Sequence, residues 1–592
     1  MNSIGKELEK QYYNLFEKYQ LEQPLNSQNI ISIIRQSLHN FLLDAEKPAI
    51  YCNGGHTKML MADFVYELKK VKYIVDNYAQ VKENKGFVLI RDDDIEVYGI
   101  DKIILSSYKF RKDLKKILKE KHSDIPVLDI YDEFEKKGIN VQADYYYSNH
   151  PYQHYKMINQ LQREIRESND IVIVKKLYVS LVTKYLHIKD FRTALIKLGE
   201  YEKYDIKARQ MLQDVKELYD LQKKAVASIS EHNVLMFCMD GLRQQDLSEQ
   251  TMPKLSRLIQ KTCYCYTNAY SFSTSTFESL VPVYSENGDL RSRYYEKNNV
   301  NIESCRFATL AEKQRRAIYI YGDAEHYVEG KHINYSEQFL TVTEKLWQFI
   351  LDACETENGM FYLHELYESH FTFSNPYTEI PLISEGTAML FDFLPAKGGH
   401  LRADYKKQHE DSIRYLDDVI EPLLSPMQCR MLIYADHGNL LLDYNTKLSE
   451  IDDMEYTCSE GWTRIPLIMR SPEVGIGTDN RLASLMQLNN MMISLLQCTT
   501  YILPDSEHIK MARSELYNPD FRFLYEMIGK RDSLQAFECF LFTDGNKLII
   551  FADGTTKVYD IYDRPNELAD KRMLFERIQG EITVCDISQV QV

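Results

Sequence analysis

Short apolar runs alternate with helix-like segments in two long stretches of the chain. Between residues 47 and 131 the runs include KPAIYC (47–52), VKYIVD (71–76), GFVLI (86–90), DKIILS (101–106) and IPVLDIY (125–131). Beyond residue 231 they include NVLMFCMD (233–240), RRAIYIY (315–321), NGMFYLHEL (358–366), RMLIYAD (430–436) and RIPLIMR (464–470). Strands that alternate with helices form parallel sheets joined by right-handed crossovers. The sequence therefore predicts two α/β domains.

The chain has 592 residues, a length that corresponds to three or four domains of about 150 residues each. The spacing of its apolar residues changes twice along the sequence. We expect a small α/β domain over residues 1–145 and a large α/β domain over residues 231–592. The segment between them, residues 146–230, has apolar residues at helical spacing. We expect this segment to be a helical linker or a hairpin of two or more antiparallel helices.

The charge balance excludes one class of function. The chain has 71 Lys and Arg against 87 Asp and Glu, a net charge of −16, and such a field repels phosphate backbones, so we expect no nucleic-acid partner. We find no signal peptide and no run of roughly 18 apolar residues, so we expect no transmembrane segment. The eleven cysteines are scattered without CxxC pairs. This usage favours reduced thiols and a cytoplasmic location.

Acidic residues and a histidine end two of the apolar runs. Asp240 follows NVLMFCM and precedes Gly241, and Asp436-His437 follows RMLIYA in the same way. Ligands of open α/β sheets bind at the carboxyl ends of strands. Carboxylate and imidazole together suit Zn²⁺ or Mn²⁺. We therefore expect a divalent metal here, although Asp-Gly is also a common turn signal.

A cluster of serine and threonine lies between these two strand ends in the sequence, at residues 271–279. The stretch after Thr276 has a helical pattern, so Thr276 is expected near a helix N-terminus. There its hydroxyl is either a helix N-cap or a nucleophile that faces an anion. Thr274 is an alternative nucleophile. A nearby metal ion would make the hydroxyl reactive, because it lowers the pKa of the hydroxyl group.

Several segments beyond residue 231 carry a family resemblance in order. They are VLMFCMDGLR (234–243), the block 252–285, YLHELYESHFTFSNPY (362–377), HEDSIRYLDDVIEPLL (409–424), YADHGN (434–439), EGWTRIPLIMRSP (460–472) and the block 546–570. Over about 360 residues this order resembles the sulfatase-like branch of the alkaline phosphatase superfamily, and most closely its phosphoethanolamine and phosphoglycerol transferases. The resemblance implies that residues 231–592 form an α/β/α catalytic domain of that type.

The resemblance also implies roles for single residues. Asp240, Thr276, Asp436 and His437 would hold one metal ion, and Thr276 would attack phosphorus. His370, together with His364, would contact the substrate phosphate or a second metal ion.

The sequence departs from the family pattern in three ways. The CxPxR motif of formylglycine sulfatases is absent, and so are the membrane-anchoring helices of the transferases. The transferases carry a further histidine about a dozen residues after DHG, and position 449 here is Ser. Glu365, Glu368 or Glu460 are the alternatives for that ligand.

A second candidate motif lies in the first domain. Asn53-Gly54-Gly55-His56 follows a predicted strand and precedes a predicted helix over residues 58–70, and Asp76 ends the next predicted strand. Gly54 and Gly55 could let the backbone approach a phosphate, and Asp76 has the spacing of a ribose contact, as in Rossmann-like domains. The full GxGxxG pattern is missing, so a structural module or one that mediates homo-oligomerisation is the default interpretation.

These observations predict a metal-dependent phosphotransferase or phosphohydrolase that acts on phosphoester substrates through Thr276. The resemblance implies transfer of phosphoethanolamine or phosphoglycerol to a cell-surface glycan precursor. Two alternatives stay open: a phosphatase, phosphodiesterase or sulfatase-like hydrolase of soluble substrates, and a binding or scaffold protein whose catalytic site has decayed.

Overall fold

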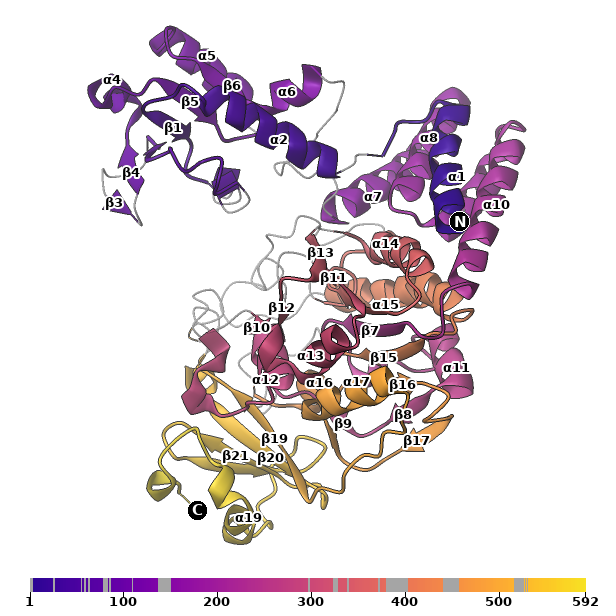
Figure 1. Cartoon of the computed structure of the whole chain (residues 1–592), viewed down its shortest axis with the longest axis vertical. Coiled ribbons are helices and arrows are strands. Elements are labelled where there is room, and N and C mark those ends of the chain that lie inside the picture. The colour runs from indigo at the N-terminus through magenta and orange to yellow at the C-terminus, as the bar shows by residue number, and fades with distance from the viewer. Residues whose placement is uncertain are drawn as a thin grey trace. The chain divides into compact units, whose positions relative to one another are not determined.

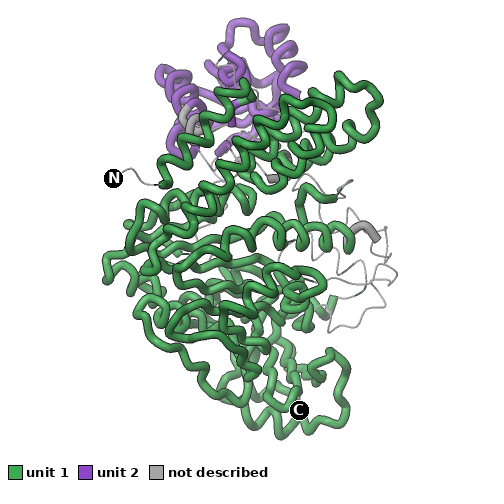
Figure 2. The backbone as a smooth tube through the Cα atoms, turned by 90° about the vertical axis from the view of Figure 1, so that its right-hand side faces the viewer, with its two compact units in different colours: residues 1–22, 154–592 green, residues 23–153 purple. Residues whose placement is uncertain are grey.

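The computed structural model describes two compact units, Met1–Glu22 with His154–Val592 (unit 1) and Gln23–Gln153 (unit 2) (Figure 2). The described residues are 4–24, 27–54, 56–57, 60–61, 64–77, 83–84, 87–108, 110–136, 151–296, 299–322, 328–337, 340–370, 373–378, 403–439, 457–515, 526, 529 and 531–591. Helix α1 (Ile4–Tyr19) belongs to unit 1, because it packs against α10 (Ala208–Ala227) and α14 (Val342–Glu355). The expected boundaries at residues 145 and 230 stay predictions.

Unit 2 contains one six-stranded sheet. Its strands are β1 (Pro48–Tyr51), β2 (Tyr73–Val75), β3 (Glu83–Asn84), β4 (Phe87–Ile90), β5 (Lys102–Leu105) and β6 (Val127–Asp129). They lie in the order β3-β4-β2-β1-β5-β6, and all neighbours are parallel except β3 and β4. The chain therefore adds strands on one side of β1 and then on the other, so the strand order reverses between β1 and β5.

Helices cover both faces of this sheet. Successive strand residues point to opposite faces, so neighbouring residues of one strand pack against different helices. Ile50 and Ile104 share a core cluster with residues of α2 (Ser27–Leu42) and α6 (Ile130–Lys136). Ala49 and Ile103 share another with residues of α4 (Ile95–Tyr98) and α5 (Arg111–Lys121). The predicted helix over residues 58–70 is wrong in its second half, since residues 64–70 form turns; Leu60, Phe64 and Leu68 nevertheless face the core. The helical spacing of these apolar residues reflects that burial.

Five long helices open unit 1. They are α1, α7 (Pro151–Glu167), α8 (Ile171–His187), α9 (Phe191–Tyr201) and α10. Two aspartates fix where the central ones begin: Asp170 accepts a hydrogen bond from the Val172 amide at 2.8 Å, and Asp190 accepts one from the Thr193 amide at 2.9 Å. Such N-caps satisfy amides that have no partner within the helix.

An eight-stranded sheet forms the centre of unit 1 (Figure 1). In order, its strands are β13 (Ile333–Glu337), β11 (Ala317–Gly322), β14 (Gly359–Glu365), β7 (Val234–Met239), β15 (Arg430–Tyr434), β16 (Leu467–Arg470), β8 (Tyr264–Tyr266) and β17 (Gly477–Asp479). The first five are parallel, and β16 runs antiparallel to β15. Every residue of β7 and β14 is buried, as expected for parallel strands that helices cover on both faces.

Two groups of helices enclose this sheet (Figure 1). One group consists of α12 (Thr276–Ser285), α13 (Arg306–Lys313) and α17 (Leu488–Gln497), and the other of α10, α11 (Pro253–Thr262), α14 and α15 (Ala403–Leu424). The α/β/α architecture predicted for this part of the chain is confirmed.

Smaller elements complete unit 1. An antiparallel sheet follows the central α/β/α layers and consists of β19 (His508–Arg513), β20 (Phe537–Phe542), β21 (Lys547–Phe551) and β22 (Thr556–Tyr559), with α19 (Lys571–Ile578) against it. The remaining short elements are β9 (Ala269–Tyr270) with β18 (Ala483–Ser484), β10 (Val300–Asn301) with β12 (Val328–Glu329), and α16 (Glu460–Thr463).

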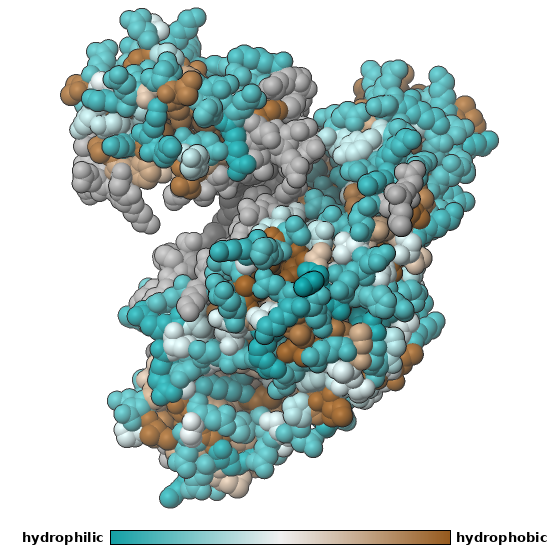
Figure 3. Space-filling model, in the orientation of Figure 1, coloured by the Kyte–Doolittle hydropathy of each residue, from teal (hydrophilic) through white to brown (hydrophobic). Residues whose placement is uncertain are grey.

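The surface is mainly hydrophilic on the face seen in Figure 3, where apolar side chains are scattered among polar ones. Within the described part of the chain, no helix is both long and apolar enough to span a bilayer.

Candidate metal and nucleophile site

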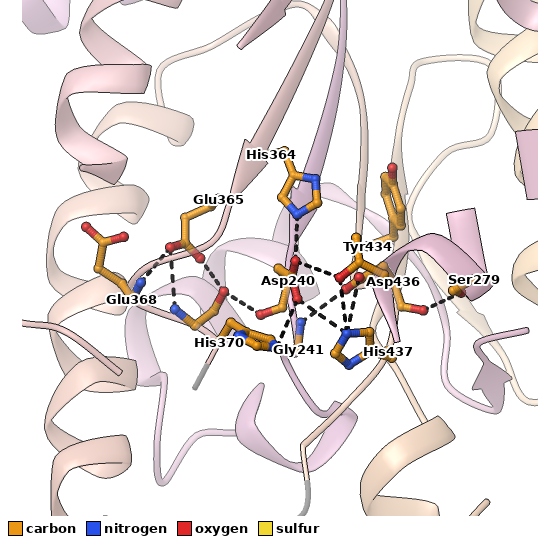
Figure 4. Close-up of polar contacts among 12 residues, drawn as sticks. Asp240, Gly241, Ser279, His364, Glu365, Glu368, His370, Tyr434, Asp436 and His437 are labelled. Carbon is orange, nitrogen blue, oxygen red and sulfur yellow. Dashed lines mark hydrogen bonds and ion pairs between the residues drawn. The ribbon is translucent and has the colours of Figure 1, made fainter. Parts of the chain in front are cut away.

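Three parallel strands bring the candidate residues together at their carboxyl ends (Figure 4). Asp240 directly follows β7, and Asp436 lies just beyond β15, which pairs with β7. His364 lies on β14, on the other side of β7, and is paired in register with Cys238. Because neighbouring parallel strands end at the same edge of a sheet, three sequence positions far apart in the chain meet at one place.

The carboxylate of Asp240 is the centre of the site. Its Oδ2 atom lies 2.8 Å from His364 Nε2 and accepts a hydrogen bond from the Thr276 hydroxyl at 3.1 Å. Its Oδ1 atom lies 3.5 Å from His437 Nε2 and 3.9 Å from His370 Nε2. Asp240 itself is fully buried, whereas the His370 side chain is 32% exposed. The site therefore has a buried floor and a partly open side at His370.

Thr276 is the first residue of α12, and Ser275 occupies the N-cap position. The Thr276 hydroxyl donates to Asp240 and lies 3.4 Å from His437 Nε2. Its hydroxyl is therefore directed toward the acidic cluster and is not used as a helix cap. The Thr276 hydroxyl lies beside Asp240 and His437, and His437 in turn lies beside Asp436; that these four residues hold one cation stays a prediction.

Backbone and side-chain bonds orient the Asp436-His437 pair. Asp436 Oδ1 accepts from the Gly241 amide at 3.1 Å, and the Asp436 carbonyl accepts from the Ser279 hydroxyl at 2.6 Å. His437 Nδ1 lies 2.6 Å from the Gly438 carbonyl oxygen. A carbonyl can only accept, so this contact assigns the proton to Nδ1 and leaves the Nε2 lone pair facing Asp436 Oδ2 at 3.4 Å.

The donor atoms suit a divalent cation. Among the described residues, two triads have ligand atoms within 4.8 Å of one another: Asp240, His370 and His437, and Asp240, His364 and Asp436. Asp240 Oδ1 and Asp436 Oδ2 are buried and have no hydrogen-bond donor. A buried carboxylate oxygen without a donor is costly unless a cation compensates it. Mixed carboxylate and imidazole donors fit Zn²⁺ or Mn²⁺.

Electrostatics couple the acid and the imidazoles of this floor. Burial acts to raise the pKa of Asp240, but its interactions with the imidazoles of His370, His364 and His437 outweigh it and lower the pKa. Burial likewise acts to lower the pKa of His364, and the hydrogen bond and charge of Asp240 outweigh it and raise the pKa. Asp240 is therefore held as a carboxylate, the form that binds a metal ion.

Two residues that the sequence analysis did not single out, Ser369 and Asn439, support the site. The Ser369 hydroxyl donates to the Asp240 carbonyl at 2.7 Å, and the Asn439 side-chain amide donates to the carbonyls of Ser369, at 3.3 Å, and of Gly241. Gly241 has a φ of +71°, and a Cβ atom there would lie 2.5 Å from Asn439 Nδ2. These contacts use backbone atoms, so no side-chain pattern in the sequence could have indicated them.

The alternative ligands for the second metal have other partners. Glu365 accepts from the Glu368 amide at 2.8 Å, Glu368 accepts from the Tyr155 hydroxyl, and Glu460 lies 2.7 Å from Lys547 Nζ. The next histidine in the chain after the DHG motif, His508, lies on β19 and is 3.0 Å from Glu581. It lines a cavity of about 320 Å³ beside the C-terminal sheet. Position 449 lies outside the described residues.

The candidate cofactor-binding residues of the first domain lie in unit 2. Gly54 follows β1 and is exposed, and Asp76 follows β2, the parallel neighbour of β1. Gly55 lies outside the described residues. Nearby, His56 bridges Ser106 Oγ at 2.8 Å and Tyr131 at 2.6 Å.

No protein-family model and no curated protein matches the sequence. Among solved structures, the chain is similar to the phosphonate monoester hydrolase from Silicibacter pomeroyi, with 12% identity and a TM-score of 0.42 over 60% of this chain and 96% of that chain. It is similar to the phosphonate monoester hydrolase of Agrobacterium radiobacter, with 12% identity and a TM-score of 0.38 over 59% and 95% of the two chains. It is also similar to lipooligosaccharide phosphoethanolamine transferase A from Neisseria meningitidis, with 14% identity and a TM-score of 0.32 over 53% and 69%.

A 2-O GAG sulfatase is similar at 11% identity, with a TM-score of 0.39 over 60% of this chain and 90% of that chain. Sulfatases and phosphoethanolamine transferases are the protein classes that the sequence resemblance names.

Proposed function

We propose that unit 1 is a metal-dependent phosphotransferase or phosphohydrolase that uses Thr276 as its nucleophile. The observation that carries this proposal is the position of the Thr276 hydroxyl, 3.1 Å from Asp240 Oδ2 and 3.4 Å from His437 Nε2. These distances place the hydroxyl beside two of the groups that would hold the cation. In a scaffold protein with a decayed site, nothing would offset the cost of burying the Asp240 carboxylate, whose Oδ1 atom has no hydrogen-bond donor.

The residues divide the chemistry among them. Asp240, Asp436 and His437 would hold a divalent cation, which supplies Lewis acidity and neutralises charge that develops on the phosphate oxygens. Asp240 Oδ2 orients the Thr276 hydroxyl, whose pKa the cation would lower; the hydroxyl proton passes to water, and the Thr276 oxygen attacks phosphorus as the bond to the leaving oxygen breaks. His370, on the open side of the site, donates a proton to that leaving oxygen. The second acceptor then attacks phosphorus and gives its proton to His370, the bond from phosphorus to the Thr276 oxygen breaks, and that oxygen regains a proton from water.

The acceptor distinguishes the two forms of the reaction. If a sugar hydroxyl attacks, the enzyme is a transferase, and the sequence resemblance implies that phosphoethanolamine or phosphoglycerol moves to a cell-surface glycan precursor. If water attacks, it is a phosphatase, a phosphodiesterase or a sulfatase-like hydrolase. A cytoplasmic location stays a prediction of the sequence.

The nucleophile is tested by mass spectrometry of the protein after incubation with a chromogenic phosphodiester and Mn²⁺ or Zn²⁺. A phosphoryl adduct is expected within residues 271–279 of the wild type. Thr276→Ala should lose both the adduct and turnover, and Thr274→Ala, the matched control in the same segment, should keep them. An adduct that persists in Thr276→Ala and disappears in Thr274→Ala would transfer the role to Thr274.

We propose, as a second function, that unit 2 binds a phosphate-bearing ligand at Gly54, Gly55 and Asp76. The strand order supports it, because it reverses beside β1 and ligands of open α/β sheets bind where the order reverses. Titration with ADP and NAD tests this: Asp76→Ala should weaken binding, and no binding by the wild type would leave the structural or homo-oligomerising module as the better interpretation.

A further inference from the structure

Three successive backbone carbonyls in and after α16 hold the three segments that carry the site. The Trp462 carbonyl accepts from the Gly438 amide at 2.7 Å, next to His437. The Thr463 carbonyl accepts from the Ser271 amide at 2.8 Å, in the segment that leads to Thr276. The Arg464 carbonyl accepts from the Gln244 amide at 3.0 Å, four residues after Asp240. A shift of α16 would therefore displace all three segments together.

A buried ion cluster ties α16 to the C-terminal sheet. Lys547, the first residue of β21, has no exposed surface, and its Nζ lies 2.7 Å from both Glu460 Oε1 and Asp563 Oδ1. Glu460 is the first residue of α16, and its amide donates to Asp563 Oδ2 at 2.8 Å. Its other carboxylate oxygen accepts from the Tyr270 hydroxyl at 3.2 Å. Both the first amide and the first side chain of α16 are thus fixed from outside the helix.

The connection between α16 and the C-terminal sheet is an ion pair between buried charged groups. Burial acts to lower the pKa of Lys547, but the charges of Glu460 and Asp563 outweigh it and raise the pKa, so Lys547 is a cation. A four-residue helix has too few internal hydrogen bonds to hold its own position. The ion cluster supplies the fixed point that the helix lacks.

We propose that Lys547 is a positioning residue for the metal and nucleophile site, which acts through Glu460 and α16. The inference rests on the proposed function for its catalytic consequence, whereas its structural consequence is independent of any metal ion. The C-terminal sheet thereby becomes part of the machinery that sets the geometry of a site formed at the ends of β7, β14 and β15.

The test compares Lys547→Met with Lys510→Met. Lys510 is a matched control because it lies in the same sheet, on β19, and its Nζ is 2.5 Å from the buried carboxylate of Glu538, away from α16. Hydrogen exchange is followed by mass spectrometry in the metal-free full chain. Lys547→Met should lose amide protection in residues 241–246, 269–273 and 437–439 together, while Lys510→Met should keep it.

The second readout is function. In Lys547→Met, Mn²⁺ or Zn²⁺ affinity should fall about 10- to 100-fold. The kcat for a phosphodiester should fall about as much while KM changes little, since a displacement of about 1 Å is enough for that loss. Wild-type exchange and wild-type metal affinity in a folded Lys547→Met protein would overturn the proposal. A wild type that binds no metal and turns over no phosphoester would instead contradict the proposed function, and the exchange data would still test the positioning role.

A further variant keeps the test valid if Lys547→Met does not fold. Lys547→Met combined with Glu460→Gln and Asp563→Asn removes all three buried charges, and Arg464, which lies 3.5 Å from Glu460, has a side chain that is 41% exposed to solvent. Reduced protection of the three segments and reduced metal affinity in this neutral variant support positioning by the ion cluster. Wild-type values for both would show that the cluster is dispensable for the site.

Discussion

Substitution of Gly438 by alanine should detach the His437 turn from α16. A Cβ atom at position 438 would lie 2.0 Å from the Gly461 carbonyl oxygen and 3.2 Å from the Trp462 carbonyl carbon. Favourable contacts need about 3.5 Å, so one of the two backbones must move by more than about 1 Å. The neighbours are backbone atoms, which cannot rotate away as a flexible side chain can.

The movement has two costs that can be worked out separately. Overpacking costs about 1 to 3 kcal/mol in the free energy of unfolding, and the Gly438 amide, once separated from the Trp462 carbonyl, adds about 1 to 3 kcal/mol as a buried donor without a partner. The displacement of His437 by about 1 Å should lower kcat about 100-fold.

Urea unfolding, metal titration and phosphodiester turnover measure these effects in Gly438→Ala. Gly580→Ala is the matched control, because a Cβ atom at position 580 meets nothing within 4 Å. Wild-type metal affinity and turnover in Gly438→Ala would refute the reasoning, since the turn would then tolerate loss of its contact with α16.

Three further results are expected. His364→Gln removes the imidazole 2.8 Å from Asp240 and leaves a buried charge, so urea unfolding should show a loss of about 3 to 5 kcal/mol, while exposed His232→Gln should show almost none. Chelation of a metal-loaded protein should lower its melting temperature, and a calorimetric scan that is unchanged by a chelator would contradict metal binding by the fold. Burial lowers the pKa of His56 from 6.5 to about 3. Between these two pH values the imidazole is protonated in the unfolded chain but not in the folded chain. Acidification from pH 7 to pH 5 should therefore cost about 2 kcal/mol in unit 2, and hydrogen exchange of unit 2 should show a smaller loss in His56→Gln.

Much of the fold could be predicted because strand positions are determined by local composition. The run NVLMFCMD contains β7, and RMLIYAD contains β15. Because all residues of β7 are buried, the strand consists of apolar residues only and is easy to recognise in the sequence. The helix expected over residues 58–70 shows the limit of such patterns. Leu60, Phe64 and Leu68 keep helical spacing, and the amides of Phe64 and Leu68 each donate to the carbonyl four residues earlier, yet the segment 64–70 consists of turns. Spacing reports which side is buried more reliably than it reports a continuous helix.

The candidate site was predictable where chemistry is carried by side chains at strand ends. Asp240, Asp436 and His437 follow two apolar runs, and parallel strands bring such residues to one edge. His364 lies inside a strand, where a histidine is as easily a core residue as a ligand. Only the register of β14 with β7, which pairs His364 with Cys238, places it beside Asp240.

The connection from Lys547 to the site is hidden from the sequence for a different reason. A lysine at the start of a strand is ordinarily an exposed residue, and the three carbonyls of residues 462–464 act without their side chains. Lys547 is buried only because Glu460 and Asp563, which lie 87 residues before and 16 residues after it in the sequence, are folded against it. Since removal of one partner leaves the other charges uncompensated, a single neutral substitution should disturb α16 more than replacement of all three charges. Hydrogen exchange of the Gly438 amide should therefore be compared in the single variant and the triple variant. The difference between them measures the cost of buried charge, and the protection that the triple variant loses measures the loss of positioning.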